Sequence, residues 1–135
     1  MIERTTLDLT TALRMIAAAH AEAHRRSIAV SVAVVDDGGH LIAFGRMDGA
    51  EIAGPVLAVD KAYTAVAHRI ATSELAALAA PGGELFGLQA NGGGRYVVFG
   101  GGVPVFVDGV VAGGVGVSGA SAADDEACAV AAIGG

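Results

Sequence analysis

Tryptophan is absent from this chain, and cysteine is nearly absent, with Cys128 its single example. One cysteine excludes an internal disulfide and any zinc centre built from several thiolates. Cys128 has two interpretations, a nucleophile or a small buried side chain on a helix. The second is favoured, because free cysteine is among the most buried residue types.

Lysine and arginine are also scarce, with 8 of them against 14 aspartates and glutamates, for a formal net charge of −6. A nucleic-acid partner needs a basic patch that neutralises phosphates. The densest basic cluster, His24–Arg26, falls at the expected end of a helix, where cations interact favourably with the helix dipole. We therefore expect no nucleic-acid partner.

Long apolar runs are missing too, although hydrophobic residues make up 53% of the chain and charged residues only 16%. A membrane-spanning helix needs about 20 apolar residues, and residues 1–11 lack the apolar core of a secretory signal. We expect a cytoplasmic protein with no membrane partner. The apolar excess favours a homo-oligomer, with a monomer densely packed from small side chains as the alternative.

The length of 135 residues fits one domain, 1–135, and its apolar periodicity divides it into eight elements. The expected helices cover residues 7–25, 55–80 and 121–133. The expected strands cover residues 28–35, 40–46, 96–99, 103–107 and 110–118. The order α-β-β-α-β-β-β-α, with two tight hairpins, predicts an α/β (α+β) fold in which helices flank a five-stranded antiparallel sheet.

Capping residues support the predicted ends of the helices. Thr5 or Thr6 is expected to cap the first helix, and Pro55 suits the first turn of the second. Ser121 begins a variant of the capping box that opens the last helix, and Gly134 suits its end.

The long helix carries two stripes of side chains. One is apolar and is expected to pack on the sheet: Val56, Val59, Tyr63, Val66 and Ile70. The other places Lys61, Thr64 and His68 one turn apart. Such a stripe suits a pocket, in which an ammonium holds a carboxylate and an imidazole ligates or transfers protons. The alternative is that Lys61 and His68 are simply solvated.

Two other places carry candidate chemistry. His20 and His24 are four residues apart on one helix face, and an imidazole at an apolar surface suits an axial haem ligand, although most such histidines are ordinary boundary residues. No metal site beyond haem iron is expected, because no further ligand pattern completes the pair. Ser118 lies at a strand end just before the last helix, and Asp125 could pair with Lys61 if their elements meet.

Several segments together resemble the GlcG/HbpS-like family, whose domain also forms the C-terminus of PduO-type proteins. They are Ser31–Asp36 (SVAVVD), Gly38–Leu41 (GGHL), Arg46–Ala50 (RMDGA), Lys61–Ala65 (KAYTA), Gly101–Pro104 (GGVP) and Gly113–Gly119 followed by Asp124–Glu126 (DDE). The resemblance implies a profilin-like fold assembled as dimers, tetramers or octamers. It also implies haem binding in several members, with haem degradation or redox sensing in some.

The resemblance carries over individual positions as expectations. Lys61 and Thr64 would line the pocket, with Gly102, Val103 and Pro104 at its rim. Ser118 is a further candidate binding residue from its position at the strand end alone. The resemblance also suggests His20 or His24 as the ligand of haem iron. If the protein binds haem, Arg46 or Lys61 would pair with a propionate.

Three functional hypotheses follow. The first is a small-ligand-binding protein whose cofactor is haem. The second is a catabolic enzyme that binds a small acidic or oxygenated substrate through Lys61, with Asp125 or His68 transferring protons. The third is a non-catalytic oligomeric module.

Overall fold

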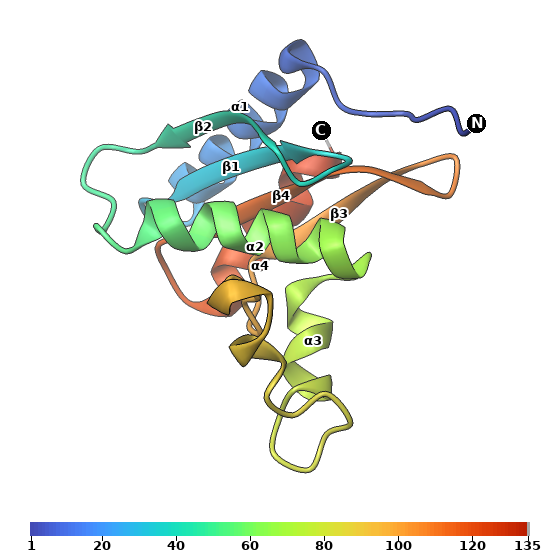
Figure 1. Ribbon diagram of the computed structural model, residues 1–135. Coiled ribbons are helices and arrows are strands. Elements are labelled where there is room, and N and C mark those ends of the chain that lie inside the picture. The colour runs from blue at the N-terminus through green and yellow to red at the C-terminus, as the bar shows by residue number, and fades with distance from the viewer. Residues whose placement is uncertain (135) are drawn as a thin grey trace.

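A four-stranded antiparallel sheet organises the described part of the chain, residues 1–134 of a computed structural model (Figure 1). The strand order is β2-β1-β4-β3. The strands are β1 (Ser31–Asp36), β2 (Leu41–Arg46), β3 (Gly102–Val107) and β4 (Val110–Ser118). The sequence predicted a fifth strand, so the mixed helix-and-sheet class is confirmed but the strand number is not.

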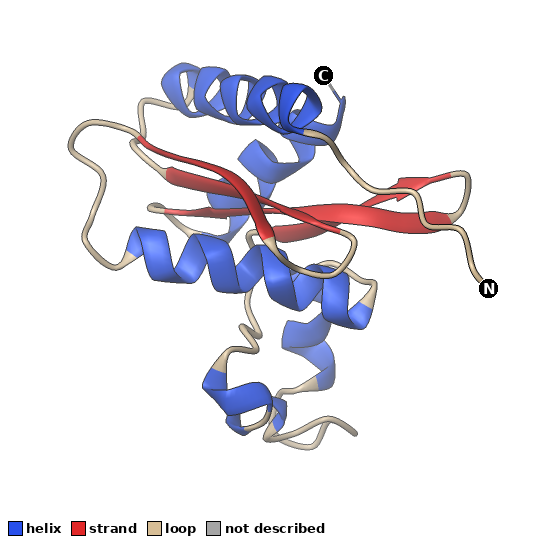
Figure 2. Cartoon of the chain, turned by 45° about the horizontal axis from the view of Figure 1, so that its top comes forward, coloured by secondary structure: helices blue, strands red, loops and turns tan. Residues whose placement is uncertain are grey.

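Helices cover both faces of the sheet (Figure 2). On one face lie α1 (Leu9–Arg25) and α4 (Ala122–Gly134), and on the other lies α2 (Gly54–His68). The short helix α3 (Thr72–Leu78) and the 3-10 turns η1 (Leu88–Ala90) and η2 (Gly92–Gly94) belong to an arm that projects beyond α2 (Figure 1). None of the helices in residues 1–134 is long and apolar enough to cross a membrane.

The predicted fifth strand is wrong because its backbone bonds to a helix side chain instead of a neighbouring strand. The Val97 N–H donates to Thr64 Oγ1 at 3.0 Å. The segment Tyr96–Phe99 therefore runs across α2 in an irregular conformation and reaches the sheet only where β3 begins.

The predicted long helix is also wrong, because α2 ends at His68 and α3 begins at Thr72. Arg69 adopts left-handed backbone with φ 61°, which breaks the helix. The break lets the Thr72 hydroxyl accept a hydrogen bond from the Gly102 N–H at 2.9 Å, so that α3 is tied to the edge strand β3.

Helix starts agree with the sequence only in part. Asp8 caps α1, since its Oδ1 accepts the Thr11 N–H at 2.8 Å. The expected caps Thr5 and Thr6 lie outside the helix, because the Leu7 N–H donates to Ala112 O in β4 and holds the chain beside the sheet. The cap of α4 is confirmed, with Ser121 Oγ accepting the Asp124 N–H at 3.1 Å.

The face of α2 that contacts the sheet is only partly the predicted one, since Val59 and Val66 of the predicted stripe take part in the contact. Small side chains, Ala58 and Ala62, pack against the sheet, whereas Val56 is 68% exposed. The reason lies in β4, where Gly114 and Gly116 leave room for the helix backbone. A Cβ at Gly116 would overlap the Ala58 carbonyl oxygen. Of the predicted apolar stripe, only Val66 is buried.

This close approach predicts a large effect of one methyl group. Gly116→Ala should lower the free energy of unfolding by about 3 kcal/mol, because the helix must move off the sheet. Urea unfolding measures the loss. Gly134→Ala is the control, since no atom lies within 4 Å of a Cβ there, and it should cost nothing. Equal stability of the two variants would contradict the packing described.

Candidate functional site

Lys61, Thr64 and His68 share one face of α2, as predicted, and the segment 95–99 closes over it. Thr64 Oγ1 donates to Asp60 O at 2.6 Å and accepts the Val97 N–H. His68 Nδ1 donates to Thr64 O at 3.0 Å, and its ring meets the Tyr96 ring edge-on at a centroid distance of 4.5 Å. The stripe is therefore covered by this chain's own backbone and side chains.

Lys61 and Asp125 form an ion pair inside the protein. Their Nζ and Oδ2 atoms are 3.1 Å apart, and the side chains are only 1% and 2% exposed. The ammonium also donates to Val117 O at 2.9 Å and lies 5.1 Å from the centroid of the Phe99 ring. The contact between the two elements, which spacing alone could not establish, is confirmed.

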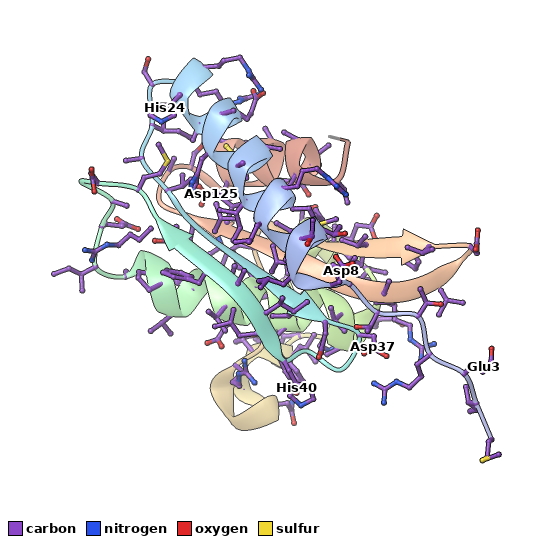
Figure 3. The ribbon with its side chains drawn as sticks, turned by 90° about the horizontal axis from the view of Figure 1, so that it is seen from above. Glu3, Asp8, His24, Asp37, His40 and Asp125 are labelled. Carbon is purple, nitrogen blue, oxygen red and sulfur yellow. The ribbon has the colours of Figure 1, made fainter. Side chains whose placement is uncertain are left out.

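Asp125 binds backbone as well as Lys61. Its Oδ1 accepts the Ala120 N–H at 2.9 Å, and its Oδ2 accepts the Gly119 N–H at 3.4 Å. The carboxylate therefore fixes the connection between β4 and α4, while Lys61 attaches both to α2. Figure 3 shows Asp125 among the interior side chains.

Burial opposes the charges of this pair. Desolvation raises the pKa of Asp125 and lowers the pKa of Lys61, and the attraction between the two groups offsets part of each shift. Burial also raises the pKa of the Cys128 thiol to about 11, so this cysteine stays protonated at neutral pH and is a poor nucleophile.

The predicted rim residues have separate positions. Gly102 lies against the Lys61 backbone, and neighbouring Gly101 leaves room for the Lys61 ammonium. Val103 packs in the core on the opposite face of the sheet. Pro104 is half-buried farther along β3. Ser118 is 3% exposed and follows Val117, whose carbonyl binds Lys61.

A surface hollow of about 350 Å³ gathers three of the predicted haem-site residues. We call it the histidine hollow, and its lining is His20, His24, Arg46, Met47 and Asp48. It lies between the C-terminal half of α1 and the end of β2, and Figure 3 labels His24 in this region.

The two histidines of this hollow differ in their hydrogen bonding. His20 Nε2 lies 3.1 Å from Gly45 O, and because a carbonyl only accepts, Nε2 must carry the proton. His24 is exposed, and no hydrogen bond of its ring occurs within residues 1–134. Among these residues no group of three His, Cys, Asp or Glu side chains could hold a metal ion.

A second and larger hollow, of about 520 Å³, lies at the other end of β2. We call it the hairpin hollow, because the turn between β1 and β2 and the hairpin between β3 and β4 form its walls. Its lining includes Arg4, Asp37, Tyr63, Arg69, Phe106 and Val110.

Sequence reasoning missed several residues around these sites. Met47 directly follows Arg46 but had no ligand pattern to mark it, and the lining of the hairpin hollow comes from separate elements. Phe99 and Thr72, which contact Lys61 and Gly102, were also missed. The run Gly100–Gly102 was a usable signal, since consecutive glycines often mark a close backbone approach.

Comparison with known proteins identifies the family. Residues 7–134 match the family model described as "Haem degrading protein HbpS-like". The chain belongs to this family. The resemblance read from the sequence is therefore confirmed over nearly the whole chain.

Individual relatives agree with this assignment. An uncharacterized 15.0 kDa protein of the dhaT-dhaS intergenic region of Citrobacter freundii is 39% identical over 128 residues, which are 95% of this chain and 90% of that protein. The crystal structure of Klebsiella pneumoniae protein ORFY matches with a TM-score of 0.97 and 34% identity, covering 99% of this chain and 92% of that one. The crystal structure of a PduOC:Heme complex matches with a TM-score of 0.92 and 36% identity, covering 96% of this chain and 94% of that one.

The Lys61–Asp125 pair predicts a coupled loss of stability. Lys61→Met or Asp125→Asn should each lower the free energy of unfolding by about 3–5 kcal/mol, because each leaves a buried group unpaired. The double variant should lose less than the sum of the two, since neither charge is left alone. Urea unfolding of all three variants measures the coupling.

The control for this cycle is Arg25→Met, a change in a cation that is 64% exposed in its ion pair with Glu22. It should cost less than about 1 kcal/mol. Single variants at positions 61 and 125 that unfold like this control would show that the buried pair does not hold the three elements together.

Proposed function

We propose that this protein binds haem in the histidine hollow. The gathering of two imidazoles and a guanidinium around one hollow carries the proposal. The family description and the heme complex of the PduOC relative support it. The same family description supports haem degradation as a further step. Degradation requires that haem binds first.

The side chains of the hollow fit the chemistry of haem. His24 has both ring nitrogens available, so we propose it as the axial ligand in preference to His20. The His20 bond to Gly45 O fixes that ring and leaves only Nδ1 with a lone pair. Met47 is less available, because its sulfur lies 3.4 Å from the Val30 N–H.

Charge in the hollow favours a specific orientation. Arg46 is exposed and would pair with a propionate, whereas Asp48 would repel one. Bound haem would supply a redox-active iron, and the chain would supply its ligand and an anion partner. The hairpin hollow is larger, but its lining includes no imidazole, thioether or thiol.

Haemin titration tests this function. The wild-type protein at micromolar concentration should give a sharp, saturable Soret band. His24→Ala should shift the band and weaken binding at least about tenfold, and Arg46→Gln should weaken binding without changing the ligand-dependent spectrum.

Two controls locate the site. His40→Ala removes an exposed histidine on the turn side of β2, outside the histidine hollow, and should bind haemin like the wild type. Arg69→Gly removes a cation from the hairpin hollow and should also leave the titration unchanged. Absence of a Soret change in the wild type, or an unaltered spectrum in a variant lacking both His20 and His24, would reject the proposal.

The enzyme hypothesis based on Lys61 has weaker support. Its ammonium would have to reach a substrate, but it is enclosed and engaged by Asp125 and Val117 O. Catalytic roles for Lys61, Asp125 and His68 stay predictions that would require the segment 95–99 to open.

We also propose that copies of this chain associate. The support is a set of large apolar side chains in contact with solvent, among them Ile52 at 90% and Val56 at 68% exposure beside the start of α2. Light scattering should give a mass above that of one chain, and Val56→Asp should reduce it because an interface would then bury an unpaired charge. A monomeric wild type across the micromolar range would contradict association.

A further inference from the structure

The hairpin hollow is independent of the proposed haem site. It lies beside the turn that carries Asp37, whereas the histidine hollow lies at the opposite end of β2 near His24. In Figure 3, Asp37 lies near the turn between β1 and β2, and His24 lies far from it at the end of α1. Its volume of about 520 Å³ falls within the range of about 300–1,000 Å³ that is typical of small-molecule sites.

Arg69 supplies the charge of this hollow. It lines the hollow from the end of α2, and none of the salt bridges within residues 1–134 involves it. Its backbone has φ 61°, the left-handed conformation that ends α2. The second cation, Arg4, donates through Nε to Asp37 Oδ2 at 2.6 Å. One positive charge therefore remains uncompensated.

Apolar surface faces the same space. Phe106 and Val110, on the hairpin between β3 and β4, are 52% and 59% exposed. Tyr63 and Val66 line the hollow from α2. The hollow therefore has solvent-exposed apolar side chains, one of them aromatic, beside an unpaired guanidinium. This combination suits a ligand with both an apolar body and an anionic group.

The backbone argues against a phosphate as that anionic group. Phosphate sites in loops use free backbone N–H groups, but those of Gly38 and Gly39 in the turn between β1 and β2 are occupied. The Gly38 N–H donates to Asp36 Oδ1 at 2.9 Å, and the Gly39 N–H donates to Asp36 O at 3.0 Å. A single carboxylate matches the one uncompensated charge and the planar fork of an arginine.

We propose that the hairpin hollow binds a small carboxylic acid with an aromatic or branched apolar body. Arg69 pairs with the carboxylate, and the body lies against Phe106 and Val110. The proposal does not depend on haem binding, because the two hollows share no lining residue.

Titration calorimetry of haem-free protein with three probes tests this site. Benzoate should bind saturably with a Kd of about 1 mM or below. Acetate should bind at least about tenfold more weakly, because it lacks the apolar body, and benzamide should bind as weakly, because it lacks the charge.

Variants identify the residues. Arg69→Gly should weaken benzoate binding at least about tenfold, and glycine suits the left-handed backbone, so the variant keeps its fold. Phe106→Ser should weaken benzoate but leave acetate unchanged. Arg14→Ala removes an exposed arginine of α1 outside the hollow and should bind benzoate like the wild type.

Three outcomes would overturn the proposal. The first is no benzoate binding at 10 mM, which is about ten times the highest expected Kd. The second is equal affinity for benzoate and benzamide. The third is an equal loss of benzoate affinity in Arg69→Gly and Arg14→Ala. Circular dichroism of each variant confirms that a loss of binding is not a loss of fold.

Discussion

The contact between α2 and the glycines of β4 determines the arrangement of the other elements. With hydrogen atoms in place of side chains at Gly114 and Gly116, the helix backbone rests directly on the strand. The interior on this side is therefore thin and filled by alanines such as Ala58 and Ala62. Close packing of small side chains fills this part of the interior, and the two hollows lie toward the two ends of β2.

The buried ion pair adds a polar link to this thin interior. Lys61 reaches past Gly101 to Val117 O and Asp125, so one side chain connects α2, β4 and the start of α4. A hydrophobic side chain of similar volume would also pack there, but it would not fix how the three elements are oriented relative to one another. The ion pair with its backbone hydrogen bonds instead holds the three elements in one relative position.

Local signals in the sequence predicted the parts of the fold that depend on neighbouring residues. Both hairpins, the Ser121 cap and the shared stripe of Lys61 and His68 are of this kind. The break at Arg69 and the path of Tyr96–Phe99 depend on contacts with Gly102 and Thr64, which are distant in sequence. For the candidate site, the structure brings His20, His24 and Arg46 to one hollow, and their role there stays a prediction. The enclosure of Lys61 could not be predicted, because it depends on the distant segment 95–99.

The arm beyond α2 has a consequence for how this chain can vary in length. Gly82 and Gly87, near its tip, have positive φ and no atom within 4 Å of a Cβ position. The base of the arm bonds to the rest of the protein, through Thr72 and Ser73 on one side and Arg95 and Val97 on the other. Residues inserted between positions 82 and 87 would extend into solvent without disturbing the sheet, so evolution can lengthen or shorten the molecule there at little cost in stability.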